Sequence, residues 1–288
     1  MTIERSFTVL RGRARSKVTL SLRILGTRAD GFHELDALAV SCSEPHDDVA
    51  LYPQRGGTTM SVIPAGAAPS RVAENLAGRA VEALRQRLPA TVAGVRVRLR
   101  KHIPVAAGLG GGSADAAEVL ALLGSHFGIR RRDLERVAAR LGSDVPFALR
   151  GAPSFLRGRG ERLGPAAGIP SLALVIATPP FGCSTPEVYR AWDELGAPSS
   201  QRVVESPLLA EGLANDLEPA ALFVAPALQT FRDSFARVAR RAPLLLGSGS
   251  SYAVIADDDE HASALADRAR DALRVATVWA GSSLASRR

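Results

Sequence analysis

A glycine-rich segment at residues 108–112 constrains this chain more than any other part of its sequence. Four of the five residues are glycine, Ser113 follows, and an alanine-rich run of helix formers begins directly after it. A backbone without Cβ atoms can lie close to a ligand, and the first N–H groups of a helix lack internal partners. The pattern therefore predicts either a phosphate-binding loop at a helix N-terminus or a plain hinge.

The spacing within this segment excludes the two best-known nucleotide loops. No Gly-Lys-Ser/Thr closes it, so it is not a Walker A motif, and the glycines do not follow the Gly-x-Gly-x-x-Gly order of a Rossmann unit. A phosphate-binding function must therefore come from the geometry of the loop and its helix.

The charge of the chain narrows the class of ligand. Its net charge of +7 and its pI of about 10.3 are compatible with nucleic acid, a membrane surface or an anionic small substrate. The basic residues are scattered along the sequence, and aromatic residues make up only 5%, which is too few for a base-stacking platform. We therefore expect small anionic substrates and no specific nucleic-acid partner.

The remaining composition indicates an ordinary globular protein. No apolar run approaches the roughly 18 residues that span a bilayer, and the N-terminus has no signal-peptide core. Cys42 and Cys183 are too few for a disulfide framework or a zinc site. We expect a soluble cytoplasmic protein without membrane partner or structural metal, in the form of a monomer or weak homodimer.

Lysine is almost absent from the chain. All but two of the 36 basic residues are arginine, and the exceptions are Lys17, in a predicted strand, and Lys101, just ahead of the glycine segment. A compact ammonium near phosphate is one explanation for these two positions; chance is the other.

Periodicity predicts an α+β chain with two domains, 1–168 and 169–288. The second half reads as β-α-β-β-α-β, the ferredoxin-like pattern. Asp30-Gly31 marks a turn, and Gly142 to Pro146 interrupts the helices. Strands are predicted near 14–25, 48–53, 58–63, 93–99, 172–177, 244–246, 252–255 and 275–279, with a hairpin at 153–168. Helices are predicted near 74–87, after Ser113, and near 131–141, 186–194, 205–213, 226–240 and 260–273.

Three segments resemble motifs of the galactokinase, homoserine kinase, mevalonate kinase and phosphomevalonate kinase (GHMP) superfamily. They are Ala14 to Leu20, Pro104 to Ser113 and Gly247 to Ser251, in the family's order. The resemblance implies a two-domain fold with a ribosomal-protein-like mixed α/β N-terminal domain and a ferredoxin-like C-terminal domain. It also implies a site in the cleft between them.

A narrower resemblance concerns the substrate. Residues 28–35, 108–113 and 141–147 are similar to the branch that uses ATP to phosphorylate the 2-hydroxyl of 4-diphosphocytidyl-2-C-methyl-D-erythritol, in the non-mevalonate pathway of isoprenoid biosynthesis. A mevalonate- or homoserine-type kinase, or a non-catalytic relative, is the alternative.

The resemblance implies two catalytic residues. Asp144 is the expected general base for the acceptor hydroxyl, and Lys17 favours its ionised form and the developing alkoxide. From the residues alone, the commoner roles are a turn or cap residue for Asp144 and a lysine lying along a strand face for Lys17.

The remaining implied roles divide between nucleotide and substrate. Ser113 is expected to help order Mg²⁺ through the ATP phosphates, or simply to cap the helix. Phe32 and Tyr189 are expected to sandwich the cytosine ring while His33 bonds its polar edge; a packed loop and a core tyrosine are the alternatives.

Thr19 stands where the family usually has Asn, and Ala114 replaces a serine. ATP contacts are expected from Pro104, Gly108, Leu109, Gly110, Gly111, Gly112, Ser113, Lys101 and Asn75, and substrate contacts from Phe32, His33, Thr19, Thr185, Tyr189, Gly247, Ser248 and Gly249.

Overall fold

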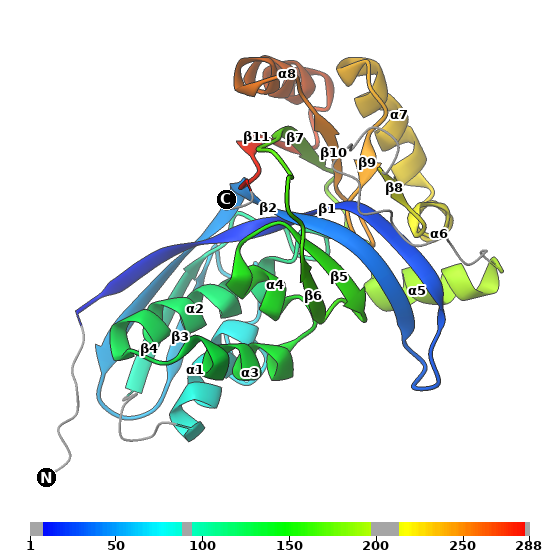
Figure 1. Ribbon diagram of the computed structural model, residues 1–288. Coiled ribbons are helices and arrows are strands. Elements are labelled where there is room, and N and C mark those ends of the chain that lie inside the picture. Colours follow the sequence, from blue (N-terminus) through cyan, green and yellow to red (C-terminus); the bar gives the residue numbers. More distant parts are fainter. Residues whose placement is uncertain (1–7, 88–93, 197–212, 286–288) are drawn as a thin grey trace, which may run out of the picture. The chain divides into compact units, whose positions relative to one another are not determined.

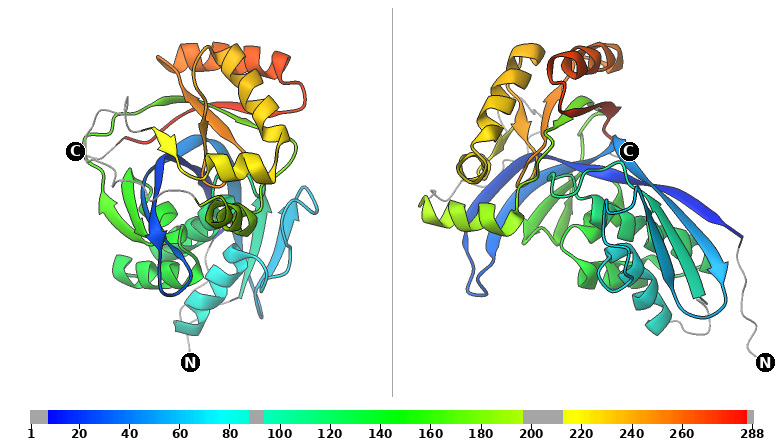
Figure 2. Two further views of the ribbon diagram at one scale, coloured as in Figure 1. Left: turned by 90° about the vertical axis from the view of Figure 1, so that its right-hand side faces the viewer. Right: turned by 180° about the vertical axis from the view of Figure 1, so that it is seen from behind.

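The computed structural model describes residues 8–87, 94–196 and 213–285 (Figure 1; two further views in Figure 2). Residue contacts divide the chain into unit 1 (1–16, 46–105 and 110–150) and unit 2 (17–45, 106–109 and 151–288). Two long strands, β1 (Leu10–Thr27) and β2 (His33–Gln54), contribute to both units. Each unit is therefore discontinuous in sequence, and the domain boundary at residue 168 stays a prediction.

Unit 1 is a sheet with helices on one face. Its strand order is β3-β4-β2-β1, with β3 and β4 parallel and β2 and β4 antiparallel. Alternate residues of these strands form one core with the helices, while the residues between them face away from it. The further elements of unit 1 are β3 (Thr59–Ile63), β4 (Gly94–Arg100), α1 (Leu76–Arg87), α2 (Gly111–Phe127), α3 (Arg131–Leu141) and α4 (Val145–Arg150).

Helix α3 shows how directly the periodic pattern determines the fold of this unit. Its apolar residues Leu134, Val137, Ala138 and Leu141 recur at helical spacing, and all four are buried in the core. The predicted helix at 131–141 is confirmed at both ends. With 17 residues, α2 is the longest described helix, and none of the described helices is long and apolar enough to cross a membrane.

Unit 2 contains the ferredoxin-like layer. Its second sheet has the antiparallel order β11-β7-β10-β9, the fourth, first, third and second strands of the predicted pattern, so that prediction is confirmed. The hairpin β5–β6 pairs with β2, and β8 pairs with β1. The elements are β5 (Ser154–Gly158), β6 (Arg162–Pro165), β7 (Ala173–Thr178), α5 (Thr185–Glu194), β8 (Ala214–Asn215), α6 (Glu218–Val224), α7 (Ala227–Ala239), β9 (Leu244–Leu245), β10 (Tyr252–Ile255), α8 (Asp259–Ala272) and β11 (Thr277–Ser282).

Several elements differ from the sequence prediction. The short strand predicted at 48–53 is the end of β2, which has 22 residues; its positions 36–42 are all buried, so the alternation that reveals a strand is hidden there. Helices α4 and α6 have only six and seven residues, too short for a visible helical period. The helix predicted at 205–213 lies almost entirely outside the described residues.

Candidate active site

The glycine segment forms the start of α2 in unit 1. Gly110 adopts a left-handed conformation (φ 68°) ahead of the helix, and its carbonyl accepts the N–H of Ala114. The N–H groups of the first turn precede any intrahelical partner and carry the positive end of the helix dipole. A Cβ at Gly112 would meet no atom nearer than 3.8 Å, so there is space beside Gly112, whereas a Cβ at Gly111 would lie 2.9 Å from Ile103 Cγ2. The predicted loop-to-helix geometry is confirmed.

The first half of the same segment belongs to unit 2, where it meets the two other motifs. Gly108 has φ +75°, and a Cβ there would lie 1.9 Å from the carbonyl oxygen of Leu246, so no other residue fits. The Lys17 N–H donates to the Leu109 carbonyl (2.9 Å), and the Ser251 N–H donates to the loop one residue before Gly108 (3.2 Å). The three segments that carried the family resemblance are therefore packed together.

Lys101 is buried in unit 1 between two aspartates. Its Nζ lies 2.5 Å from Asp47 Oδ2 and 2.6 Å from Asp115 Oδ2, and its side chain is only 4% exposed. Asp47 Oδ1 also accepts the N–H groups of His102 (2.6 Å) and Ile103 (2.8 Å). We refer to Lys101, Asp47 and Asp115 as the buried lysine cluster; it joins β2, the segment after β4 and the start of α2.

Burial and the paired charges shift the pKa values of this cluster in opposite directions. Burial raises the pKa of Asp115 to about 7, against the lowering effect of Lys101. Burial lowers the pKa of Lys101, but the charges and hydrogen bonds of the two aspartates outweigh it and leave that pKa raised. Lys101 is therefore an internal ion, and its contact with ATP stays a prediction.

Asn75 and Asp144 both lie at the beginning of helices in unit 1. The side-chain oxygen of Asn75 accepts the N–H of Ala77 (2.9 Å) and its amide donates to the carbonyl of Pro69 (2.8 Å), so it caps α1. Asp144 precedes α4, and its main-chain carbonyl accepts the N–H of Ala148 (3.1 Å). Because this contact uses the main chain, capping and proton transfer by the carboxylate remain compatible roles for Asp144.

An aromatic cluster in unit 2 surrounds His33. Its ring lies 4.9 Å from the Tyr189 ring and edge-on at 5.3 Å from Trp192, and its Nε2 lies 2.8 Å from Asp193 Oδ1. Sequence reasoning selected Tyr189 but missed the other two. All three follow the i, i+3, i+4 spacing of one face of α5, which is the signal that identifies Trp192 and Asp193.

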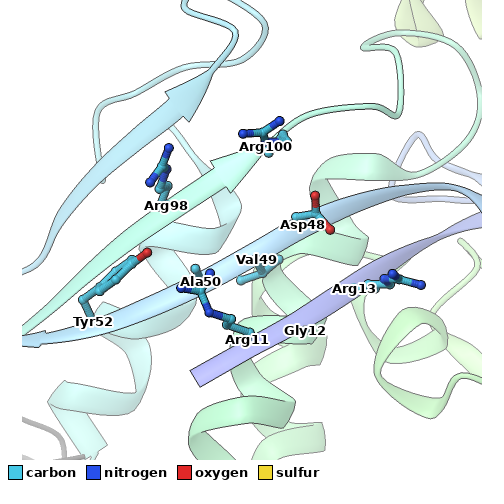
Figure 3. Close-up of a pocket in the computed structure, with 9 residues that line it drawn as sticks. All are labelled: Arg11, Gly12, Arg13, Asp48, Val49, Ala50, Tyr52, Arg98 and Arg100. Atoms are coloured by element: carbon cyan, nitrogen blue, oxygen red, sulfur yellow. The ribbon is translucent and has the colours of Figure 1, made fainter. Parts of the chain in front are cut away.

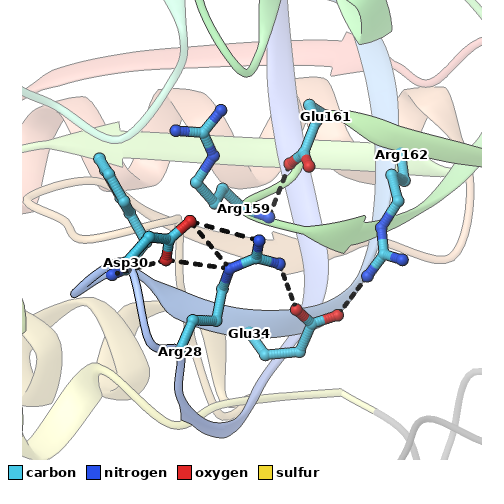
Figure 4. A network of polar contacts seen from close by, with 7 residues as sticks. Arg28, Asp30, Glu34, Arg159, Glu161 and Arg162 are labelled. Carbon is cyan, nitrogen blue, oxygen red and sulfur yellow. Dashed lines mark hydrogen bonds and ion pairs between the residues drawn. The ribbon is translucent and has the colours of Figure 1, made fainter.

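A polar network holds the turn that carries Phe32 (Figure 4). The Arg28 guanidinium donates to Asp30 (3.1 Å) and to Glu34 (2.7 Å), and Asp30 accepts the Phe32 N–H (3.3 Å). These bonds hold the pKa of Asp30 below its usual range. The Phe32 ring is half exposed, and the Arg159 guanidinium lies 4.7 Å from its centre. Phe32 is thus a fixed, accessible aromatic surface in contact with a cation that sequence reasoning missed.

The third glycine motif is anchored by two polar side chains. Ser248 Oγ and Thr185 Oγ1 are 2.8 Å apart, and the Asn215 amide donates to the carbonyls of Leu245 (2.8 Å) and Gly247 (2.7 Å). Thr185 and Ser248, both predicted substrate residues, are therefore adjacent. Thr19 is buried on β1, with 3% of its surface exposed.

The sequence resembles known proteins over nearly its whole length. Residues 75–152 match the family model described as "GHMP kinases N terminal domain". A 4-diphosphocytidyl-2-C-methyl-D-erythritol kinase of Pelotomaculum thermopropionicum is 39% identical over 274 residues, covering 91% of this chain and 94% of that protein. The enzyme of the same name from Moorella thermoacetica is 35% identical, covering 90% and 94%.

Solved structures agree with this relationship. A crystal structure of 4-(cytidine 5'-diphospho)-2C-methyl-D-erythritol kinase is 33% identical, with a TM-score of 0.81 over 95% of this chain and 99% of that one. A homoserine kinase from Cytophaga hutchinsonii is 14% identical, with a TM-score of 0.67 over 97% and 96%. The second likeness concerns the fold alone.

Proposed function

Because the chain belongs to the 4-diphosphocytidyl-2-C-methyl-D-erythritol kinases of the GHMP superfamily, we propose that it phosphorylates the 2-hydroxyl of that compound with ATP, giving the 2-phosphate and ADP. It is a small-molecule kinase of the non-mevalonate isoprenoid pathway. The observation that carries this proposal is the packing of Lys17, the glycine segment and the third motif against one another in unit 2.

Two side chains have catalytic roles in this proposal. Asp144 accepts the proton of the 2-hydroxyl as that oxygen attacks the γ-phosphorus of ATP. The Lys17 ammonium stabilises the developing negative charge on the attacking oxygen. The first turn of α2 donates main-chain N–H groups to the ATP phosphates.

The donor groups near this turn fit a magnesium ion that is held mainly by phosphate oxygens. Ser113 offers a half-buried hydroxyl on the first turn of α2. The described ranges contain no group of three histidine, cysteine or acidic residues that could hold a metal by themselves. Bound Mg²⁺ would neutralise phosphate charge, as it prefers a few protein ligands together with phosphate oxygens.

Substrate recognition is proposed to use the aromatic groups of unit 2. Phe32 presents an accessible ring for stacking on cytosine, and His33 presents a ring whose Nε2 is held by Asp193. A carboxylate on Nε2 favours a proton there, which leaves Nδ1 as an acceptor for the exocyclic amino group of cytosine. Mevalonate and homoserine carry no such base.

A coupled assay of ADP release tests the proposal. Wild-type protein should turn over 4-diphosphocytidyl-2-C-methyl-D-erythritol and not mevalonate or homoserine. The Asp144→Asn variant should bind ATP normally but lose about 10²–10⁴-fold in kcat, the usual contribution of a general base. Asp133→Asn, an exposed aspartate of α3, is the matched control and should retain full turnover.

Two results would contradict the proposal in different ways. A preference for mevalonate or homoserine would remove the cytidine substrate while leaving the chain a kinase. Unchanged kcat in Asp144→Asn would remove Asp144 as the base and leave the substrate assignment intact.

A further inference from the structure

Two pairs of arginines that are far apart in sequence surround one hollow on the sheet of unit 1 (Figure 3). Arg11 and Arg13 come from β1, and Arg98 and Arg100 come from β4. The hollow has a volume of about 520 Å³ and also contains residues 48–50 and 52 of β2 among its lining. We refer to it as the arginine hollow. The sequence shows only scattered arginines; the strand order brings these four together.

Strand geometry explains why the hollow exists. On β2 and β4, Val49, Leu51, Val97 and Leu99 enter the core beneath the helices, so the alternate residues face the other way. The register places Arg98 opposite Ala50 and Arg100 opposite Asp48. Among the residues of β2 on this face, Ala50 has a small side chain, which leaves the space between the arginines of β1 and those of β4.

The four guanidiniums of the hollow have no paired carboxylate among the described residues. Several other arginines do pair with a carboxylate, as Arg28 does with Glu34 and Arg130 with Asp133. No ion pair joins any of the four arginines of the hollow to a carboxylate of the described chain. Asp48, the acid in the lining, lies instead 3.5 Å from His102 and 3.7 Å from His46. The hollow therefore has a net excess of positive charge.

We propose that the arginine hollow binds a small molecule that carries two linked phosphate groups. A guanidinium matches phosphate oxygens through two parallel N–H bonds, which favours phosphate as the counter-charge. Arg11 and Arg13 are separated from Arg98 and Arg100 by β2, roughly 10 Å at the backbone, so the ligand is approached from two sides. That spacing favours two linked phosphates over one, and the volume lies in the range of small-molecule sites.

This site is separate from the proposed kinase machinery. None of its lining residues belongs to the glycine segment, the third motif or the aromatic cluster of His33. Its occupation is therefore a second binding activity of the chain, and the proposed function does not depend on it.

Isothermal titration with inorganic pyrophosphate tests the site. The double variant Arg11→Gln/Arg98→Gln should lose on the order of tenfold or more in pyrophosphate affinity relative to wild type. The matched control Arg130→Gln/Arg136→Gln removes the same charge from exposed positions at α3 and should retain wild-type affinity. Equal affinity of the two double variants would overturn the proposal.

A variant that is expected to bind pyrophosphate more tightly controls for misfolding. Asp48→Asn removes the acid of the lining and should strengthen pyrophosphate binding several-fold, which a damaged fold cannot do; unchanged or weaker binding would count against the site. Turnover by the hollow variant should equal that of the control variant.

Two further ligands test the chemistry of the proposal. Inorganic phosphate should bind at least about tenfold more weakly than pyrophosphate; equal binding would contradict the two-phosphate ligand. A single-stranded oligonucleotide that binds through these arginines while pyrophosphate does not would replace the small molecule with a nucleic acid and overturn the proposal.

Discussion

The buried lysine cluster and the arginine hollow lie on opposite sides of the same two segments of unit 1. Asp47 points into the cluster and Asp48 into the lining of the hollow; Arg100 lines the hollow, and the next residue, Lys101, is buried. On the buried side, one cation has two carboxylates within 2.6 Å. On the open side, four cations have none among the described residues. The buried lysine has its counter-ions within the protein, whereas the solvent-facing arginines of the hollow have no paired carboxylate among the described residues and are available to a ligand.

The cluster also has a feature that the hollow lacks. Asp115 Oδ1 is buried without a hydrogen-bond partner in the described structure, and the pKa of this carboxyl is raised to about 7 by burial. A proton on Asp115 would leave one positive and one negative charge in the cluster.

The largest change in the free energy of unfolding is expected for Lys101→Met. It leaves Asp47 and Asp115 as uncompensated buried charges, so the free energy of unfolding should fall by about 3–5 kcal/mol, as measured by urea denaturation at pH 8. Arg100→Met changes the adjacent residue on the open side and should cost less than about 0.5 kcal/mol. Similar losses of unfolding free energy in Lys101→Met and Arg100→Met would show that charges on the buried and the open side do not differ in their contribution to stability.

Asp115→Asn should change how stability depends on pH. Because the pKa of Asp115 is higher in the folded protein than the ordinary 3.8, the folded state holds this proton more tightly. Wild-type stability should therefore decrease as pH rises from about 4 to 7, by up to about 1.4 kcal/mol per pH unit from this group. Denaturation across that range should show the decrease in wild type and its loss in the variant.

The control for this experiment is Asp133→Asn. The hydrogen bond from Arg130 lowers the pKa of exposed Asp133, so its contribution has the opposite sign and is lost as pH falls. If Asp115→Asn leaves the wild-type pH dependence unchanged, Asp115 does not titrate in this window and the cluster is permanently charged.

The smallest change in the free energy of unfolding is expected for Arg98→Gln. Removing one of four neighbouring like charges should alter the free energy of unfolding by no more than about 0.5 kcal/mol, toward greater stability. The gain should disappear at high salt, because salt screens exposed charges. A destabilisation above 1 kcal/mol would mean that Arg98 has a structural partner, as Lys101 does, and the contrast between the two regions would fail.

Local pattern was enough to predict most of the elements. The apolar spacing of α3 gave its ends, and the glycines before Ser113 predicted the loop and the start of α2, because both depend on neighbours in the chain. The β-α-β-β-α-β order likewise predicted the second sheet of unit 2. For the site, the family resemblance predicted Thr185 and Ser248 separately, and the structure shows them in contact.

What the sequence alone determined is therefore most of the elements, their order and the motifs of a GHMP kinase. The tertiary structure decided which face of each strand is covered. Alternation at Asp47-Asp48 and Arg100-Lys101 shows two faces but does not say which one the helices bury, because that depends on contacts between segments about fifty residues apart. The same long-range pairing made Lys101 an internal ion, gathered four scattered arginines around Ala50, and placed Asp193 against His33.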